Sequence, residues 1–348
     1  MKIGKNIIGL DQPVFIIAEA GVNHNGNIEL AKKLVEEAKK CGADCVKFQT
    51  FKSERLVIQD APKASYQLKT TDPNESQIEM LKKLELPIDS YKSLIQHSNN
   101  NDITFLSTPY KEEDVDFLDE LGVPAFKLAS ICAAEPQFVN YVAKKGKPVI
   151  LSTGMATLEE VREAVSAFTE TGNKDLILLQ CTTNYPSMIE DTNLRAMVTM
   201  RETLGAVIGY SDHTQDDTAC IASVALGATV IEKHFTLDKN LSGPDQSSSY
   251  DPIEFKRLVG YIRKAEIALG STSKEPCEIE KKNAIGMRRS LVAKVDIEQN
   301  TVITTDMVTL KRPATGIKPS EMDKIIGKKV CQDILADSLI HWSDLEKY

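Results

Sequence analysis

The chain has 348 residues, of which 42% are hydrophobic and 26% are charged, and this is the composition of an ordinary globular protein. It excludes a disordered or fibrous chain. No apolar run approaches the roughly 20 residues that a membrane span needs. No long apolar stretch follows Lys2 and Lys5, as it would in a secretory signal. We therefore expect neither a membrane span nor a membrane partner.

The net charge of the chain is −8. It disfavours nucleic acid as a partner, because a phosphate backbone is bound by a basic surface. A small anionic substrate is compatible with this charge if cations gather at one place. The seven cysteines are scattered and form no Cys-x-x-Cys pair. Such cysteine usage indicates a reduced, cytoplasmic chain.

Eight short apolar runs cover the first two-thirds of the chain. They lie at residues 15–18, 45–48, 103–106, 125–128, 148–151, 176–179, 206–209 and 229–231. Each is nearly continuous in apolarity, which is typical of strands buried on both faces. Helical patterns lie between them, and one of these begins after Asn27, a predicted helix cap. This alternation predicts parallel strands joined by crossover helices.

Eight such units fit an α/β protein of the (β/α)8 or TIM-barrel type. An open doubly wound sheet is the alternative, but residues 19–26 do not form the Gly-x-Gly-x-x-Gly turn that it would want after its first strand. The barrel is expected over 1–270, followed by a polar linker at 271–284 and a small β-rich domain at 285–348. A domain of that size is marginal alone, so we expect it to pack on its own barrel or on a neighbouring subunit. The long connection between the second and third strands predicts a substrate lid.

Polar residues follow the apolar runs at the carboxyl ends of the predicted strands, where a barrel builds its active site. Residues two apart share one face of a strand, which pairs Lys47 with Gln49, Ser211 with His213, and Glu232 with His234. The other strand ends supply Glu19, Ser107, Thr108, Lys127, Ser130, Ser152 and the segment 180–183. The sequence therefore predicts a ring of polar side chains above an apolar barrel interior.

Lys47 and Lys127 lie within apolar strands, where an ammonium group is costly to bury without an anionic partner. Each lysine could pair with a structural carboxylate. Together with the neighbouring hydroxyl groups they could instead bind an anion with several oxygens, such as a phosphate or a carboxylate. A third interpretation is Schiff-base chemistry, since a desolvated lysine becomes nucleophilic.

His213 and His234 end consecutive strands. Either could be a hydrogen-bonded structural group. Two imidazoles on neighbouring strands could also bind one metal ion, with oxygen ligands from substrate and water.

The sequence resembles the sialic acid synthase family, the nonulosonic acid synthases that condense phosphoenolpyruvate with an N-acetylmannosamine-type sugar. The resemblance covers essentially the whole chain. It is carried in the barrel by Ile17-Ala-Glu-Ala-Gly-Val-Asn-His-Asn-Gly, Val46-Lys-Phe-Gln-Thr-Phe, Ser107-Thr-Pro, Leu151-Ser-Thr-Gly-Met, Cys181-Thr-Thr-Asn-Tyr-Pro, Gly209-Tyr-Ser-Asp-His-Thr, Ile231-Glu-Lys-His-Phe-Thr and Ser242-Gly-Pro-Asp. In the tail, Lys311-Arg-Pro-Ala-Thr-Gly-Ile is similar to that family's antifreeze-like (SAF) domain.

The resemblance implies a role for each matching residue. It assigns the catalytic group to Glu19, His213 and His234, with the two histidines also holding a divalent metal ion, manganese or magnesium. It assigns phosphoenolpyruvate binding to Lys47, Thr108, Lys127, Ser130, Ser152, Thr183 and Ser211, and sugar binding to Gln49, Cys132, Tyr185, Asp245 and Arg312. It further implies a TIM barrel with a SAF domain in a domain-swapped homodimer, in which Arg312 completes the neighbouring barrel's acceptor site.

Two positions depart from the family pattern. Many members read Lys-x-x-Ser-Gly followed by an acidic residue that contacts the sugar, whereas this chain reads Lys127-Leu-Ala-Ser-Ile-Cys132. A thiol thus replaces a carboxylate, and we expect Cys132 to line the acceptor pocket. Thr183 stands where some members carry asparagine. The first of these departures affects the expected acceptor and leaves the phosphoenolpyruvate site intact.

The expected activity is that of a transferase that joins phosphoenolpyruvate, water and N-acetylmannosamine or a related 2-acetamido hexose into an N-acetylneuraminate-type acid and phosphate. The alternative acceptor is a 2,4-diacetamido-trideoxyhexose, which would make the enzyme an N,N'-diacetyllegionaminate or pseudaminate synthase. A metal-free Schiff-base aldolase is the rival enzyme. A sugar-binding protein with an inactive barrel is the rival without catalysis.

Overall fold

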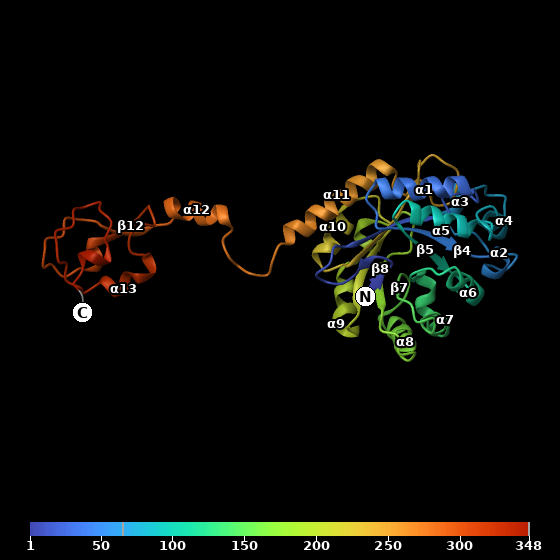
Figure 1. The fold of residues 1–348 in the computed structure, drawn as a ribbon, viewed down its shortest axis with the longest axis horizontal. Helices are drawn as coiled ribbons and strands as arrows, with labels where there is room; N and C mark the ends of the chain where they lie inside the picture. The colour runs from blue at the N-terminus through green and yellow to red at the C-terminus, as the bar shows by residue number, and fades with distance from the viewer. Residues whose placement is uncertain (65, 347–348) are drawn as a thin grey trace. The chain divides into compact units, whose positions relative to one another are not determined.

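The computed structural model describes residues 1–64 and 66–346, and the chain divides into two compact units, Met1–Gly270 and Ser271–Tyr348. The first unit is built on a sheet of eight parallel strands, which Figure 1 shows with helices around it. The strands are β3 (Phe15–Gly21), β4 (Cys45–Thr50), β5 (Thr104–Pro109), β6 (Phe126–Leu128), β7 (Val149–Ser152), β8 (Leu176–Cys181), β9 (Val207–Asp212) and β10 (Val230–His234).

The strand order is β5-β4-β3-β10-β9-β8-β7-β6. The two end strands of this order, β5 and β6, also contact each other, so the sheet is a nearly closed barrel. This confirms the predicted TIM-barrel fold. The hairpin of β1 (Lys2–Ile3) and β2 (Asn6–Ile7) precedes the barrel, and Ile3 and Ile8 join the apolar cluster inside it.

The helices between the strands bury one apolar face each against the sheet. Asn27 caps α1, since its side chain accepts hydrogen bonds from the N–H groups of Glu29 and Leu30, as predicted. The larger helices of this unit are α1 (Ile28–Lys40), α5 (Ser90–Asn100), α6 (Glu112–Glu120), α7 (Pro136–Ala143), α8 (Leu158–Thr169), α9 (Arg195–Leu204), α10 (Thr218–Ala225) and α11 (Pro252–Leu269). No helix among the described residues is long and apolar enough to cross a membrane.

Several strands run further than their apolar sequence suggests. The prediction ended the last two strands at residues 209 and 231, whereas β9 continues to Asp212 and β10 to His234. The reason is that the polar side chains at these ends bond to one another, for example Ser211 to Glu232 and Lys233 to Asp212. The functional rim is therefore part of the sheet and is held as rigidly as the sheet is.

The long connection between β4 and β5 carries three short helices before α5, namely α2 (Ser53–Leu56), α3 (Gln67–Thr70) and α4 (Gln77–Lys82). Its apolar side chains form a small cluster of their own with Val22 and Phe51, in which Met80 and Leu84 are buried. The described residues of the segment 53–86 thus form a folded substructure anchored next to the ends of the first two barrel strands.

The second unit has its own apolar core around Leu291, Ile303 and Ile340. Its regular β-structure is the antiparallel pair β11 (Ser290–Ala293) and β12 (Val308–Lys311), supplemented by isolated bridges and the short helix α13 (Met322–Ile325). Helix α12 (Glu278–Met287) occupies part of the stretch for which the sequence suggests a linker. It begins there because the Glu280 carboxylate accepts a hydrogen bond from the N–H of Cys277.

Candidate active site

The interior of the barrel changes from apolar to polar along each strand. Ile17, Cys45 and Ala125 lie in the buried apolar cluster inside the barrel. Two residues further on, and therefore on the same face, stand Glu19, Lys47 and Lys127. These polar residues line a cavity of about 690 Å³ at the carboxyl ends of the strands. The alternation of the strands thus places an apolar layer beneath a polar site.

The structure brings most of the predicted site residues into this one cavity. Those that line it are Glu19, Lys47, Gln49, Thr108, Lys127, Ser130, Ser152, Thr183, Tyr185, Ser211, His213, His234 and Asp245.

The floor of the cavity holds two lysines and two carboxylates in contact. Lys47 Nζ lies 2.6 Å from Glu19 Oε2 and 3.8 Å from Glu232 Oε2, and Lys127 Nζ lies 3.4 Å from Glu232 Oε1. All four side chains are at most 6% exposed. Both lysines are therefore paired with carboxylates, yet all four groups face the cavity, where a ligand can rearrange these contacts.

Burial and charge act in opposite directions on these groups. Burial raises the pKa of Glu19 to about 7, against the opposing effect of Lys47. For Lys127, burial lowers the pKa, and Glu232 offsets this only in part. For Lys47, burial also favours the neutral amine, but Glu19 and Glu232 outweigh it and raise the pKa. When Glu19 is protonated, the floor carries a net positive charge and suits an anion.

Hydroxyl groups surround the two lysines. Lys47 Nζ donates to Thr108 Oγ1 at 2.9 Å, and Lys127 Nζ donates to Ser152 Oγ at 2.7 Å. Ser211 Oγ donates to Glu232 Oε1 at 3.0 Å. The ammonium and hydroxyl groups are the donors that phosphate and carboxylate oxygens require.

Ser130 and Thr183 approach each other across Gly154. The N–H of Gly154 donates to Ser130 Oγ at 3.1 Å. A Cβ atom at this glycine would lie 2.3 Å from Thr183 Oγ1 and 2.9 Å from Ser130 Oγ. Only glycine therefore allows both hydroxyl groups to converge on this side of the cavity.

His213 and His234 lie beside each other, with ring centroids 5.3 Å apart. His213 Nδ1 lies 2.7 Å from the carbonyl oxygen of Thr182. Because a carbonyl only accepts hydrogen bonds, Nδ1 carries a proton, and in the neutral imidazole Nε2 keeps its lone pair. The buried Nδ1 of His234 has no hydrogen-bond partner among the described residues.

These two imidazoles fit a divalent metal ion. The carbonyl at His213 Nδ1 is the outer-shell contact that commonly orients a ligating histidine, and burial lowers the pKa of His234, which favours its neutral form. Among residues 1–64 and 66–346, no group of three or more His, Cys, Asp or Glu side chains could hold a metal. An ion held here by His213 and His234 would take its remaining ligands from water or substrate oxygens.

The outer part of the cavity is aromatic and polar on one side. The Tyr185 ring lies 4.2 Å from that of His213 and 5.0 Å from that of Tyr66, measured between centroids. Asp245 also lines this part, and burial raises its pKa to about 6. Gln49 Nε2 lies 3.4 Å from Glu19 Oε1. This side offers hydrogen bonds and ring faces to a sugar.

Another part of the cavity lining is apolar. It comes from the connection between β4 and β5, which also contributes the polar Tyr66, Gln67 and Gln77 to the cavity. The apolar side chains of this connection that line the cavity are Leu56, Val57, Met80, Leu81 and Leu84. These side chains, defined here as the apolar wall, would face a methyl group more favourably than a hydroxyl group, because an unbonded hydroxyl is costly to bury. The predicted lid segment therefore contributes directly to the lining.

One predicted sugar contact within the barrel unit, Cys132, does not line the cavity. Cys132 is 1% exposed and packs in the apolar core between sheet and helices, because the 3-10 helix of Ser130–Ala134 turns it inward while Ile131 faces the cavity. Burial also raises the pKa of the Cys132 thiol to about 12. The expectation that Cys132 lines the pocket is thus corrected. Arg312 is exposed in the second unit, directly after β12.

Several cavity residues have no role in the sequence-based prediction, and three of them contact predicted site residues. Glu232, although noted at the rim, is the carboxylate shared by both lysines. Tyr110 OH donates to Gln49 Oε1 at 3.1 Å. Cys181 Sγ lies 3.8 Å from His213 Nδ1. The alternation of strand residues could have identified Glu232 and Cys181, whereas Tyr110 follows β5 and carries no sequence signal.

Comparison with known proteins agrees with this geometry. The NeuB family matches residues 34–274, and the SAF domain matches residues 288–346. The N,N'-diacetyllegionaminic acid synthase of Campylobacter jejuni is 46% identical over 93% of this chain and 98% of that protein. The human N-acetylneuraminate-9-phosphate synthase is 37% identical over 96% of this chain and 93% of that protein.

A solved structure shares the architecture. The crystal structure of N-acetylneuraminic acid (sialic acid) synthetase from Leptospira borgpetersenii, in complex with citrate, is 33% identical and superposes with a TM-score of 0.74. The match covers 81% of this chain and 94% of that one. The chain therefore belongs to the NeuB family of phosphoenolpyruvate-dependent, carbon–carbon bond-forming transferases and ends in a SAF domain.

Proposed function

We propose that this protein is a nonulosonic acid synthase that condenses phosphoenolpyruvate with an N-acetylated amino sugar and releases phosphate. One observation carries the proposal. Lys47 and Lys127, with their hydroxyl partners, lie on the floor of the same cavity that presents His213 and His234. A trianionic donor and a sugar aldehyde would thus meet in one pocket.

The chain's own residues bind and orient the donor. Lys47 and Lys127 neutralise its phosphate and carboxylate, while Ser152 and Ser211 fix its orientation through hydrogen bonds. The new bond joins C3 of phosphoenolpyruvate to the aldehyde carbon of the sugar. Water then adds at C2, and phosphate leaves with its bridging oxygen.

Glu19 is the proposed proton carrier. Its pKa of about 7 allows it to hold or accept a proton near neutral pH. It contacts both Lys47 and Gln49, and so lies between the proposed donor and acceptor regions. We assign it the deprotonation of the attacking water or the protonation of the sugar oxygen.

A divalent ion, manganese or magnesium, is proposed at His213 and His234, where it would act as a Lewis acid toward the open-chain sugar aldehyde. Chelator-treated enzyme should lose activity and recover it when manganese is added. Activity that survives exhaustive chelation, with no metal detectable in the protein, would show that this assignment is wrong.

The apolar wall favours a 2,4-diacetamido-2,4,6-trideoxyhexose as acceptor over N-acetylmannosamine. Such a sugar has a methyl group at C6 and two acetamido methyls, which suit Leu56, Val57 and Leu81. The similarity to the Campylobacter jejuni N,N'-diacetyllegionaminic acid synthase supports the same acceptor class. We propose this class as the physiological acceptor.

Phosphate release with a panel of acceptors tests the proposal. We expect kcat/KM to be highest for a diacetamido-trideoxyhexose and lower for N-acetylmannosamine and its 6-phosphate. Lys127→Met should abolish phosphate release. Lys147→Met serves as a control, since Lys147 also pairs with a carboxylate, that of Asp119 at 2.6 Å, but lies outside the cavity. Absence of phosphate release with every sugar would refute synthase activity.

A Schiff-base aldolase is the second candidate, because burial lowers the pKa of Lys127. Borohydride would trap a covalent adduct between Lys127 and a carbonyl substrate in that case, and chelation would have little effect. The synthase proposal predicts no trapped adduct and full sensitivity to chelation.

We further propose a homodimer in which Arg312 of one subunit completes the acceptor site of its partner's barrel. The guanidinium group offers several donors in a fixed fork, which suits the hydroxyl and amide oxygens of a sugar. Arg312 is exposed and hence available for such a contact.

A further inference from the structure

A buried ion pair lies on the outer face of the two strands that carry the histidines. Asp212 of β9 and Lys233 of β10 are directly opposite each other in the sheet register. Lys233 Nζ lies 2.6 Å from Asp212 Oδ2, and the two side chains are 1% and 0% exposed. Neither residue lines the cavity, since each is offset by one position from the side chains that do.

This pair holds the chain on both sides of His213. Asp212 precedes the histidine and Thr214 follows it, and Lys233 Nζ donates to both the Asp212 carboxylate and the Thr214 carbonyl oxygen. Asp212 Oδ1 also accepts from the Thr214 N–H at 2.9 Å. The segment around His213 therefore wraps around one ammonium group.

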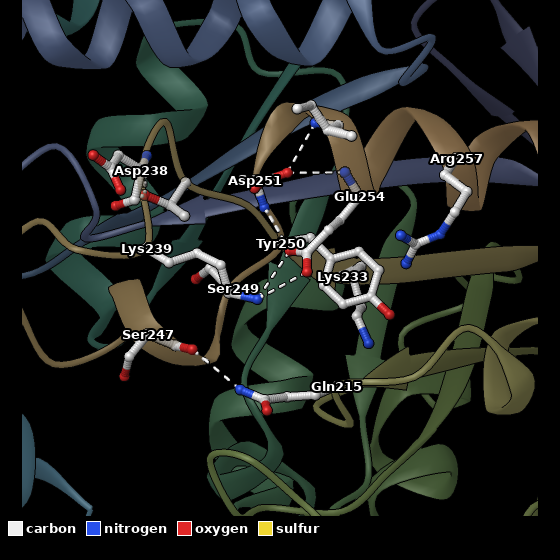
Figure 2. Close-up of polar contacts among 12 residues, drawn as sticks. Gln215, Lys233, Asp238, Lys239, Ser247, Ser249, Tyr250, Asp251, Glu254 and Arg257 are labelled. Atoms are coloured by element: carbon white, nitrogen blue, oxygen red, sulfur yellow. Dashed lines mark hydrogen bonds and ion pairs between the residues drawn. The ribbon is translucent and has the colours of Figure 1, made fainter.

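The same ammonium group is linked to the backbone of His234. It lies 4.2 Å from the centroid of the Tyr250 ring, and Figure 2 shows these two side chains beside each other. Tyr250 N–H donates to the carbonyl oxygen of His234 at 2.8 Å, and Tyr250 OH donates to Asp217 at 2.9 Å. Lys233 thus contacts the supports of both histidines at once.

A buried ion pair adds little to stability compared with apolar residues of similar size. Its effect here is geometric, because it joins the side chains of Asp212 and Lys233, which would otherwise be connected through the sheet backbone. We propose that Lys233 and Asp212 are positioning residues that set the spacing and orientation of His213 and His234 for the metal ion. This inference rests on the metal site of the proposed function.

Manganese affinity, measured from the electron paramagnetic resonance signal of free Mn²⁺, tests the proposal on the full-length protein. Lys233→Met should weaken binding by about 10-fold to 100-fold, as is usual for outer-shell partners of a metal site. Lys233→Arg should restore part of the affinity, because it keeps the charge. Lys147→Met, which removes a comparable lysine–aspartate pair near the Phe126 ring, should bind manganese as the wild type does.

If Lys233→Met does not fold, Asp212→Asn makes the same comparison, since the amide can still accept from Thr214 but carries no charge for Lys233. A folded variant of either kind with wild-type manganese affinity would overturn the positioning role and leave the metal site intact. A wild-type protein that binds no manganese would overturn both.

Discussion

Individual ionisable side chains in this barrel are buried for two different purposes. Glu19, Lys47 and Lys127 face the cavity and are available to bind a ligand. Lys233 and Asp212 are buried on the other face of the sheet, where they link β9 to β10. The distinction follows from a single offset in strand position. His24 belongs to neither set, because it is buried beside the Phe48 ring and its Nδ1 accepts a hydrogen bond from Gly26 in its own turn.

His24 should make stability depend on pH. Burial lowers its pKa from 6.5 to about 4, so between these values the unfolded chain binds a proton that the folded chain does not. The free energy of unfolding should therefore fall by up to about 3 kcal/mol from this residue as the pH decreases from 7 to 4. In urea titrations across this range, His24→Asn should lose less stability than the wild type.

Asparagine can still accept the Gly26 N–H that His24 Nδ1 now accepts at 3.0 Å. The exposed His341 provides the control for the loss of an imidazole group, and the pH dependence of His24→Asn is compared with that of His341→Asn. Parallel stability profiles for His24→Asn and the wild type would contradict the prediction.

At the scale of elements, the interior of the barrel is packed so closely that one strand requires glycine. A Cβ atom at Gly209 in β9 would lie 2.5 Å from the carbonyl oxygen of Val230 and 2.6 Å from Leu179 Cδ2. Gly209→Ala should therefore lower the free energy of unfolding by about 3 kcal/mol through overpacking. Gly260 in α11 has no such neighbour within 4 Å, and Gly260→Ala should raise it by about 1 kcal/mol through helix propensity.

Far-ultraviolet circular dichroism during urea unfolding is the suitable measurement for this pair of variants. The single tryptophan, Trp342, lies in the second unit, so its fluorescence would report on the wrong part of the chain. Equal stability of the two alanine variants would show that the strand contacts at Gly209 are looser than the structure indicates.

The β4–β5 connection should determine acceptor choice. Leu81→Gln places an amide in the apolar wall and should lower kcat/KM for a 6-deoxy acceptor by at least about 10-fold, the effect of a lost apolar contact in a pocket. KM for phosphoenolpyruvate should change little, because the donor residues lie on the barrel floor. Leu68→Gln is the control, since Leu68 belongs to the same connection but is 47% exposed. Equal losses for all acceptors would contradict a role in selectivity.

For the whole molecule, the barrel and most of the cavity could be predicted because parallel strands impose one alternation on every unit. Once Lys47 and Lys127 are assigned inward positions, the same alternation predicts inward positions for Thr108 and Ser211. Cys132 could not be placed in this way, since it belongs to a 3-10 turn after β6 and not to a strand. The apolar wall also escaped prediction, because short helices within a long connection have no period that indicates which side faces a cavity.

The proposed homodimer predicts that two inactive variants complement each other. Arg312→Ala and His234→Ala homodimers should each be nearly inactive, since one lacks the proposed sugar contact and the other a proposed metal ligand. In a mixed dimer, the barrel of the Arg312→Ala chain keeps His234 and receives Arg312 from its partner. One of the two sites is then complete, so the heterodimer should regain activity that neither parent shows.

Heterodimers purified through two different tags provide the measurement, with phosphate release as the readout. Lys324→Ala is the control for the second unit, because Lys324 is exposed and pairs with Glu321 in its own turn, and its homodimer should remain active. Recovery requires exchange between the subunits. If each barrel used the Arg312 of its own chain, one site of the mixed dimer would lack Arg312 and the other would lack His234. Heterodimers as inactive as their parents would therefore show that Arg312 acts within its own chain or not at all.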